Sequence, residues 1–186
     1  MSIRKKILAI SIGPVLVLGV ITLLFMLTMV KSSLMDEVQD ALKGTAAATL
    51  AAYDQNTGDY LESTNGDIWK GSYNISKSES LVDRIKENTG MDVTFFYGNK
   101  RIMTSALDKK GNRILGSEAG ERVVNQVIKG KKPFFSTNVS LDGTRNYGYF
   151  IPVYQNGTTD QVIGMVFVGT NKARKDAIVN KILGSI

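Results

Sequence analysis

A run of 24 uncharged residues near the N-terminus constrains this sequence more than any other feature. Residues 7–30 read ILAISIGPVLVLGVITLLFMLTMV, and fifteen of them are Leu, Ile, Val or Phe. At a rise of about 1.5 Å per residue they make a helix of roughly 36 Å, enough to cross a hydrocarbon core of about 30 Å. Membrane helices tolerate a proline such as Pro14. We therefore predict a transmembrane helix over residues 7–30.

The alternative for this segment is a cleaved signal peptide. Such a peptide has a shorter apolar region and a cleavage site between small residues, and residues 26–34 offer no convincing site. Arg4, Lys5 and Lys6 precede the helix, whereas charges of both signs follow it. By the positive-inside rule, residues 1–6 are expected in the cytoplasm and the rest of the chain outside the cell.

The composition of the exported part limits the functions that it can have. Three of the 23 basic residues precede the helix, so residues 31–186 carry 20 basic residues against 17 acidic ones. They form no dense basic stripe, and no nucleic-acid partner is expected. The sequence has no Cys and no His, which excludes a disulfide, a Ser-His-Asp triad and His- or Cys-liganded metal sites. We expect no metal, no cofactor and no enzymatic activity.

The first exported segment is predicted to continue the membrane helix through Ser33–Tyr53. Apolar and small residues recur there at helical spacing, which indicates either packing on the domain core, packing on a partner subunit, or both. Residues 56–74 are polar and rich in Gly and Asp, and they predict an irregular connection. Ser76 and Glu79 fit a capping box, which predicts a helix over 77–89 that ends at Gly90.

The rest of the chain predicts an α+β fold with a five-stranded antiparallel sheet. Runs of β-branched and aromatic residues separated by Gly-Asn, Asp-Gly and Asn-Gly turns predict strands over 92–97, 100–106, 133–140, 144–153 and 161–170. Ser117 is placed to cap a helix that Gly130 ends, and a last helix begins at Lys172. Helices would cover one face of the sheet, and the intervening helix and loops would close over the other face. Such a cupped face can hold a small ligand.

Two stretches of this sequence resemble the extracellular single Cache domain of bacterial methyl-accepting chemotaxis receptors. The first is GMDVTFFYGNKRIMTSALDKKGNRILGSEAGERVVNQVIKGKKPFF, and the second is NYGYFIPVYQNGTTDQVIGMVFVG. The Gly-x-Asp-Val-Thr entry, the Arg-x-x-Thr-Ser second strand and the Val-Ile-Gly-Met last strand carry the resemblance. It covers about residues 34–175 and rests on the order and spacing of these motifs.

The resemblance implies a PAS-like sheet, extracellular ligand sensing and a homodimer. Together with the hydropathy and charge pattern, it predicts a cytoplasmic N-terminus (1–6), the transmembrane helix (7–30), a membrane-proximal helix (31–56), a single Cache sensor domain (57–171) and a C-terminal helix (172–186). It also implies a second membrane helix and cytoplasmic signalling modules beyond Ile186. The chain is thus expected to be a fragment of a longer receptor or a truncated protein.

The first candidate ligand-binding residues lie on the second strand of the predicted sheet. Arg101 offers a planar guanidinium that suits a carboxylate, and Thr104 and Ser105 follow it with hydroxyl groups. The resemblance supports Arg101 and Thr104, since related pockets often carry an Arg three residues before a hydroxyl or imidazole. On a regular strand Arg101 and Thr104 point to opposite faces, so both face a ligand only where a bulge or the strand end intervenes.

The other candidate ligand-binding residues are aromatic. Tyr147 and Tyr149 share one face of the fourth predicted strand and can form a pocket wall or part of the core. Trp69 and Tyr73 lie in the 56–74 connection and can form a lid over the pocket or a small separate core. The expected ligand is a small molecule, with a carboxylate or amino acid as candidates.

These observations favour the ligand-sensing region of a transmembrane chemotaxis receptor. A histidine kinase or a diguanylate cyclase could follow the same sensor, and the sequence beyond residue 186 would distinguish them. A membrane-anchored extracellular hydrolase would need a paired acid or an activated nucleophile, and the carboxylates are scattered. A purely structural anchored domain is the remaining alternative.

Overall fold

The computed structural model describes residues 3–184, with side chains from residue 12 onward. The chain divides into two compact units: residues up to Val38 together with those from Ala177, and residues Gln39–Asp176. Helix α1, Ile3–Asp54, begins in the first unit and ends in the second. The predicted continuation of the apolar helix through Ser33–Tyr53 is therefore confirmed.

The first unit contains the apolar part of α1. Its most apolar 18-residue window has a mean hydropathy of 2.4, and no residue of that window is buried within the chain. Pro14 lies inside the helix without ending it. By length and composition, α1 is able to cross a membrane, and the span over residues 7–30 stays a prediction.

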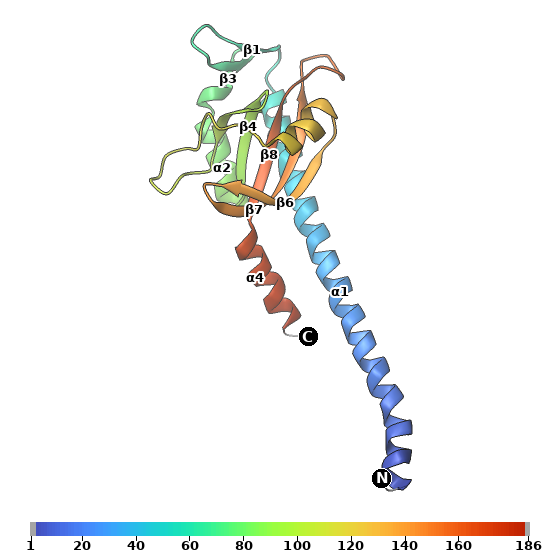
Figure 1. The fold of residues 1–186 in the computed structure, drawn as a ribbon. Helices are drawn as coiled ribbons and strands as arrows, with labels where there is room; N and C mark the ends of the chain where they lie inside the picture. Colours follow the sequence, from blue (N-terminus) through green and yellow to red (C-terminus); the bar gives the residue numbers. More distant parts are fainter. Residues whose placement is uncertain (1–2, 185–186) are drawn as a thin grey trace. The chain divides into compact units, whose positions relative to one another are not determined.

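The second unit is built on a five-stranded antiparallel sheet, in agreement with the predicted α+β fold (Figure 1). The strand order is β5-β4-β8-β7-β6. The strands are β4 Asp92–Tyr97, β5 Lys100–Thr104, β6 Phe134–Leu141, β7 Thr144–Tyr154 and β8 Val162–Asn171. Helix α4, Lys172–Leu183, follows β8 directly.

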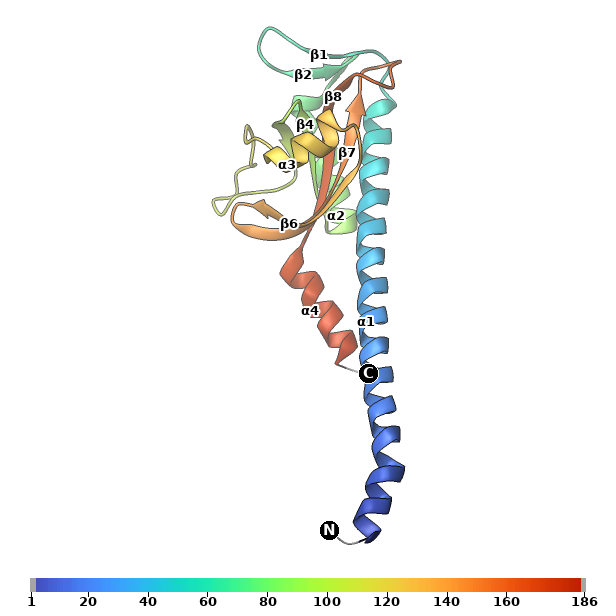
Figure 2. The ribbon, with the colours of Figure 1, turned by 45° about the vertical axis from the view of Figure 1, so that its right-hand side comes forward.

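Alternating residues of the sheet serve two different cores. Phe95 of β4 faces α1, where its ring centroid lies 5.1 Å from that of Tyr53. Phe96 faces the other side and packs in a cluster with Val127, Phe150 and Phe167. Figure 2 shows the short helix α3, Glu121–Val123, on one side of the sheet and the end of α1 on the other. The predicted covering of both faces is confirmed.

The prediction of an irregular connection over residues 56–74 is wrong. The segment contains three short antiparallel strands, β1 Tyr60–Glu62, β2 Ile68–Lys70 and β3 Tyr73–Asn74, in a second sheet. The side chain of Gln155 anchors this sheet, because it accepts a hydrogen bond from Tyr60 N at 2.7 Å and donates one to Tyr60 O at 3.0 Å. These strands are stabilised by distant residues, which local sequence patterns do not reveal.

Both predicted N-caps are also wrong. A 3₁₀ turn, η1 Ile75–Lys77, precedes helix α2, Glu79–Thr89, and Ser78 rather than Ser76 stands before α2. The Ser76 hydroxyl instead accepts a hydrogen bond from Ile68 N. The second helix starts after Gly120 rather than Ser117, and it continues as a π-helical segment, η2 Val124–Lys129. The predicted end of α2 at Gly90 is confirmed, with φ of +69°.

Candidate ligand-binding site

The sheet face that carries Phe96 borders a cavity of about 500 Å³. The sheet contributes aromatic rings, β6 contributes the residues from Phe134 to Ser140, and the segment before α3 contributes polar groups at the rim. The lining residues are Phe96, Arg101, Glu118, Ala119, Gly120, Arg122, Val123, Phe134, Phe135, Ser136, Thr137, Asn138, Val139, Ser140, Phe150 and Phe167. The cavity thus combines an apolar wall with charged and hydroxyl groups, as small-molecule sites do.

The aromatic wall depends on two glycines in neighbouring strands. Phe150 of β7 pairs with Phe167 of β8, and their ring centroids are 4.7 Å apart. Gly148 and Gly169 form the next pair on the same face. A Cβ added to Gly148 or Gly169 would lie 2.5 Å or 2.4 Å from ring atoms of Phe167. Because neither glycine has a side chain, the Phe167 ring can lie flat over both of them on this face of the sheet.

Arg101 is the buried cation of this cavity. It is 8 % exposed, and its guanidinium carbon lies 5.4 Å from the centroid of the Phe96 ring. Its Nη1 donates a long hydrogen bond of 3.4 Å to Ile114 O, while Nε is buried and has no partner among the described residues. No carboxylate of the part that the structure describes forms an ion pair with it. Burial lowers the pKa of Arg101, and the charge of Asp92 opposes this shift.

The backbone N–H and C=O of Arg101 both form hydrogen bonds with the segment that precedes α3. Arg101 N donates to Ser117 O, and Gly116 N donates to Arg101 O, both at 2.9 Å. Ala119 N donates to Asn99 O at 2.8 Å. Residues 116–119 are thereby fixed beside β5, which places Glu118 at the rim of the cavity.

The rim carries one further charge of each sign. Glu118 and Arg122 are both exposed and both line the cavity. The guanidinium of Arg122 lies 5.3 Å from the centroid of the Phe134 ring. These two residues were not predicted from the sequence, because Glu118 precedes α3 and Arg122 lies within it, so no regular spacing links them.

A register shift brings Arg101 and Thr104 to the same face of the sheet. Arg101 pairs with Phe96 and Thr104 with Thr94, so β5 has one extra residue between these pairs. Thr104 nevertheless does not line the cavity. Its hydroxyl lies 2.7 Å from that of Thr94, 3.1 Å from Val93 O and 3.1 Å from Ala106 N. These three hydrogen bonds use its capacity within the protein.

Ser105 is also buried and bonded internally. Its hydroxyl accepts a hydrogen bond from Val93 N at 2.9 Å and donates one to Asp92 Oδ1 at 3.2 Å. Lys86 Nζ donates to Ser105 O at 3.1 Å and pairs with Asp92 at 2.8 Å. Ser105 therefore helps to connect α2, β4 and β5, and it is not among the lining residues of the cavity.

The four aromatic candidates lie away from the cavity. Tyr147 and Tyr149 alternate with Phe150 on β7 and point to the opposite face of the sheet. Trp69 belongs to β2 and Tyr73 to β3, and the Tyr73 ring centroid lies 6.2 Å from that of Tyr53. Of the seven predicted residues, Arg101 alone lines the cavity in the part of the chain that the structure describes. Ligand contact by any of them remains a prediction.

A protein-family model described as single cache domain 3 matches residues 73–182. A search of curated proteins finds no significant match. An extracellular ligand-binding receptor from Desulfohalobium retbaense has a TM-score of 0.55 at 16 % identity, covering 83 % of this chain and 26 % of the other.

Two further solved structures come from the Campylobacter jejuni chemoreceptor Tlp3. Its ligand-binding domain in complex with L-valine has a TM-score of 0.55 at 12 % identity, covering 85 % of this chain and 63 % of the other. Its sensory domain with isoleucine bound has a TM-score of 0.55 at 13 % identity, with coverages of 85 % and 62 %. This chain thus spans between about a quarter and two thirds of these proteins, and at such identities the likeness concerns the fold.

Proposed function

Because the chain belongs to the single cache domain 3 family, we propose that residues 57–171 are an extracellular sensor domain for a small carboxylate ligand. An amino acid with an apolar side chain is the first candidate. The observation that carries this proposal is Arg101, a guanidinium that is buried at the cavity and has no carboxylate partner among the described residues. A buried charge is costly unless it is paired, and a ligand carboxylate would supply the missing partner.

The other lining groups support an amino acid rather than a simple anion. In the proposed pose the carboxylate meets Arg101, the ammonium meets Glu118 at the rim, and the side chain packs against Phe134, Phe150 and Phe167. A volume of about 500 Å³ is within the range of roughly 300–1,000 Å³ for ligand pockets. The Tlp3 structures with L-valine and isoleucine support the choice of these compounds as first probes.

The proposed setting is the cell membrane. Residues 1–6 would lie in the cytoplasm, residues 7–30 would cross the membrane, and residues 31–56 would continue outside as a membrane-proximal helix. Residues 172–186 would lead back toward the membrane. We propose that the sensor works as a homodimer in a chemotaxis receptor, with the conformational signal passing through α1 and α4. Binding shifts this signal only when the two conformations have different affinities for the ligand.

A thermal-shift screen tests the proposal. The twenty L-amino acids and a set of short carboxylates are added to the detergent-solubilised chain, to Arg101→Gln and to Arg84→Gln. Arg84 is exposed and lies outside the cavity, so its substitution is the matched control. At least one carboxylate is expected to raise the melting temperature of the wild type and of Arg84→Gln.

Calorimetry with the best compound then measures the contribution of Arg101. A hydrogen bond to a charged group contributes about 1.5–3 kcal/mol, so Arg101→Gln should weaken binding roughly tenfold to a hundredfold. Equal affinity of wild type and Arg101→Gln would overturn the assignment of Arg101. A screen in which no compound stabilises the wild type would overturn the proposed ligand class.

A further inference from the structure

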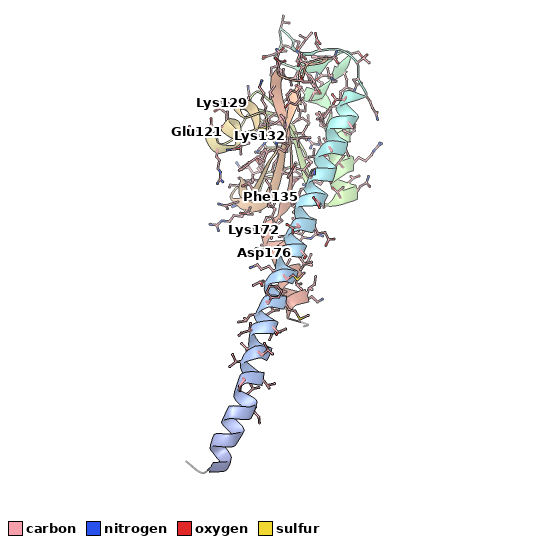
Figure 3. All side chains as sticks on the ribbon, turned by 90° about the vertical axis from the view of Figure 1, so that its right-hand side faces the viewer. Glu121, Lys129, Lys132, Phe135, Lys172 and Asp176 are labelled. Atoms are coloured by element: carbon pink, nitrogen blue, oxygen red, sulfur yellow. The ribbon has the colours of Figure 1, made fainter. Side chains whose placement is uncertain are left out.

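Tyr147 connects the sheet to the first turn of α4. It is almost fully buried, and its hydroxyl donates a hydrogen bond to Asp176 Oδ1 at 2.5 Å. Lys172 Nζ donates a hydrogen bond to the same hydroxyl at 2.7 Å. Lys172 and Asp176, one helical turn apart on α4, are 3.6 Å apart. Figure 3 shows these two side chains next to each other, below Phe135.

These contacts form a closed group of three polar side chains, which we call the α4 latch: Tyr147, Lys172 and Asp176. The Tyr147 hydroxyl is both donor and acceptor, so one phenol satisfies an acid and a base of the same helix turn. Burial, and the hydrogen bond to Asp176, raise the pKa of Tyr147, while the bond to Tyr147 raises the pKa of Lys172. The phenol thus stays protonated and able to donate at physiological pH.

The strand that edges the cavity contacts the latch directly. The Phe135 ring of β6 stacks on the Tyr147 ring, with centroids 6.3 Å apart and an interplanar angle of 9°. Phe135 pairs with Tyr149, so its ring lies on the Tyr147 side of the sheet. Its neighbours Phe134 and Ser136 pair with Phe150 and Gly148 on the cavity face, and all three residues of β6 border the cavity. A displacement of β6 by a ligand would therefore act on the Tyr147 ring, because β6 lies at the edge of the sheet and pairs with β7 alone.

We propose that Tyr147 is a positioning residue that couples occupancy of the cavity, through Phe135, to the hold of the sheet on the first turn of α4. The ligand-dependent part rests on the proposed function. The latch itself does not, because its contacts join side chains of the chain alone. Tyr147 is not among the residues that line the cavity, so in this proposal it acts through Phe135 and α4.

Hydrogen exchange on the whole chain in detergent tests the latch without any ligand. Tyr147→Phe keeps the ring and removes both hydroxyl bonds, and Tyr149→Phe is the matched control on the same strand and face. Losing a hydrogen bond to a charged group should speed exchange in the first turns of α4 roughly tenfold in Tyr147→Phe. Tyr149→Phe should leave α4 unchanged, and amides of β4 and β8 report any global loss of stability in both variants.

A double-mutant cycle tests the link between the α4 latch and strand β6. Phe135→Leu removes the ring stacking and keeps the latch hydrogen bonds. If Phe135 acts through Tyr147, the effects of Phe135→Leu and Tyr147→Phe on α4 exchange are non-additive. Unchanged α4 exchange in Tyr147→Phe would overturn the latch, and additive effects would overturn its link to β6.

The third test adds L-isoleucine to the wild type and to the variants, and calorimetry on the same samples measures whether it binds. In the wild type it should change α4 exchange, whereas in Tyr147→Phe it should still bind without changing α4 exchange. An equal response of both proteins would overturn the coupling role of Tyr147. If no heat of binding appears in any variant while the cycle remains non-additive, the choice of an amino acid ligand fails and the latch stands.

Discussion

The ring of Phe167 and the two glycines beneath it determine how much room the cavity has. Gly148 and Gly169 face each other on β7 and β8, and a methyl group at either position would collide with that ring. We predict that Gly169→Ala destabilises the fold by about 1–3 kcal/mol, as overpacking of a core does. Urea denaturation measures this change.

Gly44→Ala is the control for Gly169→Ala. Gly44 lies in α1 with no atom within 4 Å of its added Cβ, so the substitution should be neutral or stabilise the helix by up to about 1 kcal/mol. Because Phe167 lines the cavity, a shift of its ring in Gly169→Ala should also weaken ligand binding. Equal unfolding free energies for the two variants would contradict this account of the glycine pair.

The ion pair of Asp83 with Arg113 is expected to make the stability of the fold depend on pH. Arg113 bonds Asp83 through two nitrogens, at 2.9 Å and 2.5 Å, and also donates to Thr104 O at 2.7 Å. The Arg113 hydrogen bonds lower the pKa of Asp83 below its ordinary value. Its stabilising contribution is therefore present above the unfolded pKa of about 3.9, and it is lost as the pH falls through the lower folded value.

Asp83→Asn should accordingly melt at a lower temperature than the wild type at neutral pH, and the difference should shrink below about pH 4. Melting curves across pH 2.5–7 (roughly the range bracketing the aspartate titration) follow this trend. Asp160→Asn, a substitution at an exposed position, is the control. A deficit of Asp83→Asn that stays constant down to the acid end would refute the ionic role of Asp83.

At the scale of elements, the sequence predicted the five-stranded sheet because runs of β-branched and aromatic residues are separated by Gly-Asn, Asp-Gly and Asn-Gly turns. The small sheet β1-β2-β3 was not predicted, because two- and three-residue strands have no measurable period. The two N-caps were misplaced for a related reason. A serine near a helix start can bond elsewhere, as Ser76 does with Ile68, and Ser117 contributes its carbonyl to Arg101.

The site was predictable to a smaller extent than the fold. Arg101 could be selected because its guanidinium suits a carboxylate and because the resemblance places an arginine three residues before a hydroxyl at this strand. The tyrosines of β7 could not be assigned to a face, because both faces of this sheet are buried and the alternation carries no polar signal. The aromatic wall at Phe134, Phe150 and Phe167 looks like ordinary core in the sequence.

Gln155 connects the two sheets, and removing its side chain should destabilise the small sheet β1-β2-β3. Gln155→Ala removes both hydrogen bonds to the backbone of Tyr60, each worth about 0.5–1.5 kcal/mol. Hydrogen exchange should therefore accelerate in β1 and β2, while amides of β4 and β8 keep their protection. Gln161→Ala, at an exposed position, is the control. Unchanged exchange in β1 would contradict the anchoring role of Gln155.

At the scale of the whole molecule, the absence of cysteine allows a clean test of the proposed topology. Ser2→Cys places a thiol before the apolar helix, and Asn156→Cys places one in the exposed β7–β8 turn. In spheroplasts, a membrane-impermeant maleimide should label Asn156→Cys directly and Ser2→Cys only after the membrane is opened. Labelling of both positions in closed spheroplasts, or the reverse order, would contradict an N-terminus inside the cell.

The central claim is that the buried guanidinium of Arg101 receives the carboxylate of a ligand, and NMR of ¹⁵N-arginine-labelled protein tests it most directly. The Arg101 Nε–H signal is identified by its absence from Arg101→Lys. The compound that stabilises the chain most in the thermal-shift screen should move this signal and slow its exchange with water, because Nε is unpartnered in the described structure. The Arg84 signal should stay in place. Binding of that compound with no change in the Arg101 signal would contradict the claim.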